Sequence, residues 1–221
     1  MAVAAVGLFL IGYQWGNQFQ SAREAPLRIE GVLLRPPIDL PELELYGPQG
    51  PFNRDDLRGH WSLITFGSPG SAVGHRGVAR LIEIANRVAD QPDLRGNLRL
   101  LLISADDAPI LARDFEQLTP SLRVLSAPAQ QLAELRESIG AGQSADPEAV
   151  DLPPPLFLID PKARFVSLFS GEQPAASIAE DLKTLSQQPD GLPSAPAPVT
   201  DPNVAPANAA TETATGAPAA V

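Results

Sequence analysis

Ser71 and His75 are the side chains of this chain with the clearest potential for chemistry. They stand in the segment ITFGSPGSAVGHRG (64–77), where a β-branched and aromatic strand end meets a Gly-Ser-Pro-Gly turn and then an apolar pattern of helical spacing. Four residues apart, both would share one face of that helix, where a histidine can activate a serine as a nucleophile. The sequence signals no oxyanion hole and no group that orients the histidine, so the simpler interpretation is that Ser71 caps the helix.

Metal ligands are scarce in this chain. Its 221 residues include no cysteine, two histidines and one methionine, which excludes disulfides, thiolate catalysis and thiolate metal ligands within the chain. We therefore expect no resident cofactor. The alternative is a weak copper site at His75, helped by Asp106 and Asp107 at the end of a neighbouring strand. A solvated His75 and an acidic helix N-cap at Asp106–Asp107 are the simpler interpretations, and His60, beside Trp61, is expected to face solvent.

The composition argues against nucleic acid as a partner. The formal net charge is −10, with 16 basic against 26 acidic residues, and the sequence has no basic cluster. Binding to phosphates requires concentrated lysine and arginine. Hydrophobic residues make up 44% of the chain and charged residues 19%, which is typical of a globular domain.

Both ends of the chain differ from its middle. The stretch 1–19 is largely apolar, carries no Lys or Arg, and is expected to be an N-terminal membrane anchor, with a buried helix of a soluble protein as the alternative. Residues 20–40 are expected to form a polar, proline-containing tether. The alanine- and proline-rich segment 188–221 is expected to be a disordered tail, because it cannot bury enough apolar surface to offset its chain entropy.

Strand and helix patterns alternate over residues 41–187, the expected domain. Strand patterns cover 43–46, 61–67, 98–104, 122–125, 156–160 and 165–169, and helical patterns cover 71–89, 108–117, 129–139 and 175–185. The order predicts an α/β domain, and its closing hairpin and helix are those of the second half of a thioredoxin-like fold.

Four stretches carry a resemblance to a known family. They are FNRDDLRGHWSLITFG (52–67), LLLISAD (100–106), SAPAQQLAEL (126–135) and the hairpin PLFLIDPKARFV (155–166). On these stretches the chain, from about Gly31 to Leu185, resembles the Sco/SenC family of thioredoxin-like proteins.

The resemblance implies a place and a task for the protein. Members of that family are membrane-anchored and face the bacterial periplasm or the mitochondrial intermembrane space. They deliver copper to the binuclear copper site of cytochrome c oxidase or keep that site reduced. We therefore expect a membrane-anchored protein with its globular domain in the bacterial periplasm. Its expected partners are the membrane, through the N-terminal helix, and a cytochrome c oxidase subunit or another copper chaperone.

The ligand positions of the family are not retained in kind. The family binds copper through a C-x-x-x-C motif and one distant histidine, and by register these positions fall on Ser71, His75 and about Leu152. The C-x-x-C register of the peroxide-reductase and TlpA-like thioredoxins would use Ser71 and Gly74. In either register no thiolate remains. Pro154, ahead of the closing hairpin, is either a cis-proline inherited with the fold or part of an ordinary proline-rich start to a strand.

Three functions follow as hypotheses. The first is an accessory factor in cytochrome c oxidase assembly and copper-site biogenesis that acts by binding and is not an enzyme. The second is a weak copper carrier that uses His75. The third is an enzyme that uses Ser71 and His75, or a redox role that borrows the thiols of a partner.

Overall fold

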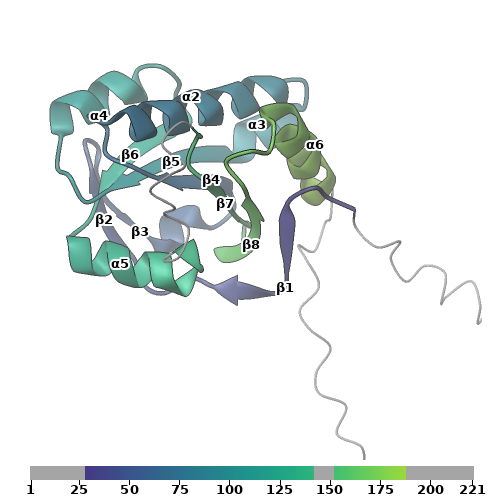
Figure 1. Ribbon diagram of the computed structural model, residues 1–221, viewed down its shortest axis with the longest axis horizontal. Helices are drawn as coiled ribbons and strands as arrows, with labels where there is room; N and C mark the ends of the chain where they lie inside the picture. The colour runs from purple at the N-terminus through teal and green to yellow at the C-terminus, as the bar shows by residue number, and fades with distance from the viewer. Residues whose placement is uncertain (1–27, 142–151, 188–221) are drawn as a thin grey trace, which may run out of the picture.

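A single eight-stranded sheet organises the protein. The computed structural model describes residues 28–141 and 152–187 (Figure 1). The strand order is β1-β8-β7-β4-β5-β6-β2-β3. The strands are β1 (Val32–Asp39), β2 (Glu44–Gly47), β3 (Gly50–Asn53), β4 (Trp61–Phe66), β5 (Leu98–Ser104), β6 (Leu122–Ser126), β7 (Leu156–Ile159) and β8 (Arg164–Phe169). The helices are the 3₁₀-helix η1 (Arg54–Leu57) and α2 (Ala72–Arg87), α3 (Pro92–Asn97), α4 (Pro109–Glu116), α5 (Ala129–Ser138) and α6 (Ala175–Ser186).

Strand β5 lies at the centre of the sheet and is buried on both faces. It pairs in parallel with β4 and with β6, while β7 runs antiparallel to β4. Leu100 and Leu102 point into one apolar cluster, and Leu101 and Ile103 point into the other. The continuous apolar run of β5 is therefore explained by helices on both sides of the sheet, as expected for buried parallel strands.

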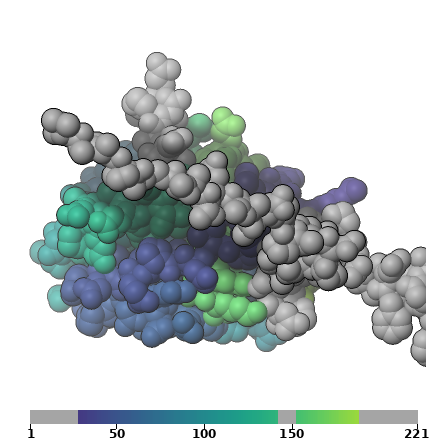
Figure 2. All heavy atoms as spheres, turned by 90° about the horizontal axis from the view of Figure 1, so that it is seen from below, coloured from purple at the N-terminus to yellow at the C-terminus, as the bar shows by residue number. Residues whose placement is uncertain are grey.

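The two faces of the sheet are covered differently. Helices α2, α3, α4 and α6 contribute to the cluster on one face, while α5, η1 and the β2–β3 hairpin contribute to the other (Figure 1). Figure 2 shows this second side, with the β2–β3 region between α5 in teal and the β7–β8 turn in green. The backbone N–H of Gly59 donates to the carbonyl of Pro161 at 2.9 Å and joins the end of η1 to that turn.

The predicted order of strands and helices is confirmed, and the structure adds four elements to it. Within the range 20–40, expected as a tether, Val32–Asp39 forms strand β1, which pairs with β8 at the edge of the sheet. β3, η1 and α3 are also additional. β3, η1 and α3 escaped prediction because they are short. β1, with eight residues, escaped it because it carries two prolines, which are tolerated in an edge strand but remove the usual strand pattern.

A buried carboxylate fixes the start of β1 to the last helix. Asp181 of α6 accepts hydrogen bonds from the backbone N–H groups of Glu30, at 3.1 Å, and Gly31, at 2.9 Å. The side-chain amide of Gln173 donates to the same carboxylate at 3.0 Å. A Cβ at Gly31 would lie 2.5 Å from the ring of Phe169, so only glycine allows the chain to pass this close.

The two ends of the chain lie outside the described residues. This concerns both the predicted anchor over 1–19 and the predicted tail over 188–221. Among residues 28–141 and 152–187, no helix is both long and apolar enough to cross a membrane.

Candidate functional site

The loop that follows β4 is held close to the start of α2. The N–H of Gly67 donates to Ile103 of β5 at 3.1 Å, and the N–H of Ser71 donates to the carbonyl of Ser68 at 3.0 Å. A Cβ at Gly74 would lie only 2.0 Å from the Ser68 oxygen. The loop can therefore fold back on the first turn of α2 only because residue 74 has no side chain.

Ser71 is the N-cap of α2, which confirms the simpler of its two interpretations. Its Oγ accepts a hydrogen bond from the N–H of Gly74 at 3.0 Å and donates its own proton to the Ser68 carbonyl at 2.9 Å. The hydroxyl therefore satisfies one of the unpaired donors of the helix start. Its proton points to a backbone carbonyl, so this arrangement does not prepare the oxygen for attack on a substrate.

His75 lies on the exposed side of α2. Its ring contacts the edge of Phe115 in α4, with centroids 5.2 Å apart and planes at 88°. Within the part of the chain that the structure describes, no group of three or more His, Asp or Glu side chains could hold a metal ion. The positions that the sequence register assigns to the family's three ligands hold a serine that caps a helix, one exposed imidazole and Leu152. This donor set does not fit copper.

Asp106 and Asp107 do not cap a helix, so that prediction was wrong. The N-cap of α4 is Ala108, which makes no side-chain capping bond, and Pro109 is the first helical residue. The chain instead turns at Ser104, whose Oγ accepts from the N–H of Asp106 at 2.9 Å. The two carboxylates stand too early in the sequence to reach the free N–H groups of the helix, and both are exposed.

The segment to which the sequence register assigns the third ligand position lies at the start of the closing hairpin. Leu152 is exposed, whereas Pro154 is buried against α2, where a Cβ at Gly77 would come within 3.1 Å of its ring. Over the described ranges the only cis peptide bond is Arg35–Pro36. The alternative of a cis bond at Pro154 was therefore wrong, and the proline-rich start of β7 is the interpretation that holds.

Arg80 is a site residue that the sequence did not reveal. Its side chain is buried, with 6% of its surface exposed, and it donates to the carbonyls of Ser170 at 2.7 Å and Pro154 at 3.3 Å, and also to the carbonyl of Gln173. Burial lowers the pKa of Arg80, and the charge of Glu83 partly opposes this. Arg80 thus ties the segment at the third ligand position to α2. A charged residue within the apolar stripe of a predicted helix was the signal that could have identified it.

Apolar side chains are exposed around this edge of the sheet. Because β4, β5 and β6 are parallel, the loops that follow them meet at one edge, and the N-terminal end of β7 lies there too. Five exposed residues at this edge are named here the apolar rim: Tyr46, Val73, Ile110, Leu111 and Leu152. Ile110 has 75% of its surface exposed and Tyr46 54%.

A cavity lies beside the apolar rim. It has a volume of about 460 Å³ and is lined by Tyr46, by Pro69 of the loop after β4 and by the segment 105–109. Tyr46 reaches this place because β2 pairs with the end of β6, where the Oγ of Ser126 donates to the Tyr46 carbonyl at 3.2 Å. The cavity has both apolar and acidic walls, and it adjoins the loop that carries Ser71.

Comparisons of sequence identify no relative of this chain. No family model matches it, and no curated protein matches it.

Comparisons of structure give a consistent fold. Copper-bound yeast Sco1 superimposes with a TM-score of 0.55 at 16% identity, over 69% of this chain and 94% of that one. Apo Sco1 from Thermus thermophilus gives a TM-score of 0.54 at 22% identity, over 74% of this chain and 99% of that one. Copper-bound ScoI from Arabidopsis thaliana gives a TM-score of 0.54 at 15% identity, over 66% of this chain and 98% of that one. The chain therefore has a thioredoxin-like α/β fold similar to that of Sco proteins, as its sequence predicted, and it lacks the cysteines required for Sco-type thiol chemistry.

The capping role of Ser71 predicts a specific pattern of stability. Ser71→Ala should lower the free energy of unfolding by about 1 kcal/mol, because the Gly74 N–H loses its acceptor. Ser71→Asp should retain most of that stability, since aspartate is an equally good N-cap and its charge suits the positive end of the helix. Urea unfolding measures both variants. If Ser71→Asp is as unstable as Ser71→Ala, the hydroxyl has another task.

Arg80 is predicted to hold the segments at both ends of the closing hairpin. Arg80→Met should cost about 2 kcal/mol of stability, because three carbonyls lose their charged donor. It should also speed amide hydrogen exchange at 156–157 and 170–173, relative to α5. Arg87→Met is the matched control: it removes the same charge from the same helix, but only from an exposed pair with Glu83, at a cost of no more than about 0.5 kcal/mol. Equal effects of the two variants would contradict the role given to Arg80.

Proposed function

We propose that this chain is an accessory factor in cytochrome c oxidase assembly that acts by binding a partner at the edge of the sheet where Sco proteins carry their copper ligands. The observation that carries the proposal is the apolar rim. It surrounds a loop of the inherited shape whose ligand positions hold Ser71, His75 and Leu152. The relation to oxidase assembly is supported by the Sco-like fold and by the sequence resemblance.

The chemistry at this edge supports binding over catalysis. The Ser71 hydroxyl is engaged in a helix cap, and the His75 ring packs on Phe115. With no cysteine in the chain, electron transfer through a dithiol would have to rely on the partner's groups. What the edge offers to another molecule is its shape and its apolar surface.

The arrangement of the apolar rim supports a protein partner. Large apolar side chains that remain exposed at one edge of a domain are typical of interaction surfaces. The rim residues come from α2, α4, β2 and the start of the closing hairpin, which are distant in sequence and lie at the same edge of the sheet. Asp106 and Asp107 beside them give the surface an acidic border.

The proposed partner is a cytochrome c oxidase subunit or another copper chaperone. The proposed location is the bacterial periplasm, with residues 1–19 as the membrane anchor. Both rest on the resemblance to the Sco/SenC family.

Ile110 provides the test of the binding surface. Full-length protein carrying a tag at its C-terminus should recover an oxidase subunit or a copper chaperone from membranes of the native organism, and Ile110→Asp should reduce that recovery at least about fivefold. Leu118→Asp is the matched control, because Leu118 is also exposed but lies beyond the opposite end of α4. Recovery of no such partner by the wild type, or equal recovery by the two variants, would contradict the proposal.

Copper binding by His75 is the alternative to be tested directly. We expect the purified chain to bind neither Cu(I) nor Cu(II) more tightly than micromolar, because one exposed imidazole is a poor site for either ion. Titration of the wild type beside His75→Ala should therefore give the same result for both proteins. Tight binding that is lost in His75→Ala would replace the accessory role with that of a copper carrier.

A further inference from the structure

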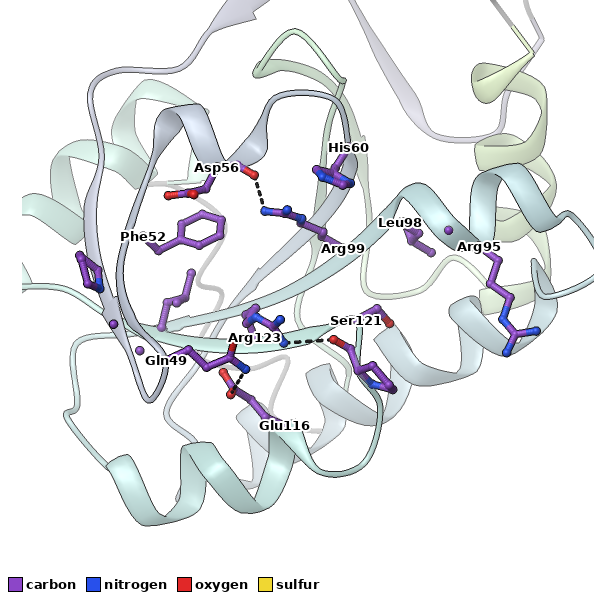
Figure 3. A pocket seen from close by; sticks show the side chains of 16 residues that line it. Gln49, Phe52, Asp56, His60, Arg95, Leu98, Arg99, Glu116, Ser121 and Arg123 are labelled. Atoms are coloured by element: carbon purple, nitrogen blue, oxygen red, sulfur yellow. Dashed lines mark hydrogen bonds between the residues drawn. The ribbon is translucent and has the colours of Figure 1, made fainter.

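A second cavity lies at the edge of the sheet where the parallel strands begin, opposite the edge that carries Ser71. It has a volume of about 450 Å³ and lies between the β2–β3 hairpin, η1 and the N-terminal ends of β5 and β6 (Figure 3). Parallel strands separate the two edges, because β4, β5 and β6 all start at this one and end at the other. The cavity is therefore independent of the apolar rim. Its volume is in the range of small-molecule sites.

Two arginines line this cavity from neighbouring strands. Arg123 of β6 is in register with Leu101 of β5, two residues beyond Arg99, so both arginines face the same side of the sheet. Arg99 donates to the carbonyl of Asp56, and Arg123 donates to the carbonyl of Pro120 at 3.0 Å (Figure 3). Arg123 also donates to the carbonyl of Leu122 at 3.0 Å. A guanidinium has five N–H donors, so these bonds fix the side chains and leave donors for a ligand.

The charges of the two arginines are not neutralised by an ion pair. Over the described residues, neither Arg99 nor Arg123 has a carboxylate within salt-bridge distance. The carboxylate of Glu116 instead accepts from Gln49 and from the backbone of Val124, each at 3.1 Å. Burial lowers the pKa of Arg99; the Asp56 charge opposes this, and Arg123 adds to it.

His60 adds a titratable group to the same wall. Its side chain lies beside Arg99 (Figure 3), and its Nδ1 is buried with no hydrogen-bond partner in the described part of the chain. Burial lowers the pKa of His60, and the charge of Arg99 lowers it further. An interaction with the Asn97 backbone acts in the opposite direction and raises this pKa. The prediction that His60 faces solvent was therefore too simple, because the ring is half-buried in a cationic wall.

We propose that this cavity binds a small molecule through a phosphate or carboxylate group held between Arg99 and Arg123, with His60 beside it. Planar guanidinium groups bind such oxyanions through paired hydrogen bonds. The bonds to backbone carbonyls hold both groups in place before the ligand arrives, which reduces the entropy lost on binding. In a chain with a formal net charge of −10, two neighbouring arginines that form no salt bridge within the described residues provide a local site for an anion, although Asp56 and Glu116 also line the cavity.

Calorimetric titration of the full-length chain with pyrophosphate and, separately, with succinate tests the proposal and distinguishes the two oxyanions. At least one should bind with a dissociation constant below about 1 mM at constant ionic strength. Arg99→Gln and Arg123→Gln should each weaken binding at least about tenfold, the effect of losing a charge-assisted hydrogen bond. Arg113→Gln, an exposed arginine of α4 that does not line the cavity, is the control and should bind as the wild type does.

The two histidines report where the anion binds. In NMR spectra the ring signals of His60 should move on titration, whereas those of His75, at the other edge, should not. Arg99→Lys and Arg123→Lys keep the charge and address the case in which a glutamine variant fails to fold: each should bind more weakly than the wild type. The proposal would be overturned if neither probe binds, or if the Arg99 and Arg123 variants bind as tightly as the wild type. It would also be overturned if Arg113→Gln loses as much affinity as those variants do.

Discussion

The parallel pairing of β4, β5 and β6 is the constraint on which the rest of this structure depends. Leu98–Ser104 is apolar on both faces, so it is stable only at the centre of a sheet covered by helices on both sides. Parallel connections then return the chain to the same starting edge each time. As a result, the ends of all three strands gather at one edge, and their beginnings gather at the other.

The two edges have opposite character because of this arrangement. At the ends of the strands, the loop of Ser71 and the apolar rim present apolar and acidic groups. At the beginnings, Arg99 and Arg123 present cationic groups from adjacent strands. The sequence contains no run of basic residues, since the arginines are distant from each other along the chain. A cationic cavity within an acidic protein is therefore a product of strand register.

Polar groups with backbone partners hold together the segments around the start of α2, the closing hairpin and β1. Arg80 supplies a charged donor to three carbonyls around the closing hairpin, and Asp181 supplies a charged acceptor to the start of β1. Ser71 closes the first turn of α2. These bonds involve the backbone and neither thiols nor a metal, so the Sco-like fold is retained without the chemistry that the cysteines provide in Sco proteins.

The sequence by itself determined the absence of thiol chemistry, the order of the main strands and helices, and the cap at Ser71, because composition, periodicity and capping are local properties. Only the tertiary structure decided that β1 joins the sheet despite its prolines, that Asp106 and Asp107 miss the start of α4, and that Arg80 is buried. It also placed Arg99 and Arg123 on one wall. The pairing of β1 and the shared wall of Arg99 and Arg123 depend on contacts between segments far apart in the chain, where neither spacing nor propensity carries a signal. For Arg80 the sequence offered only its place in an apolar stripe, and the carbonyls that it binds come from the distant closing hairpin.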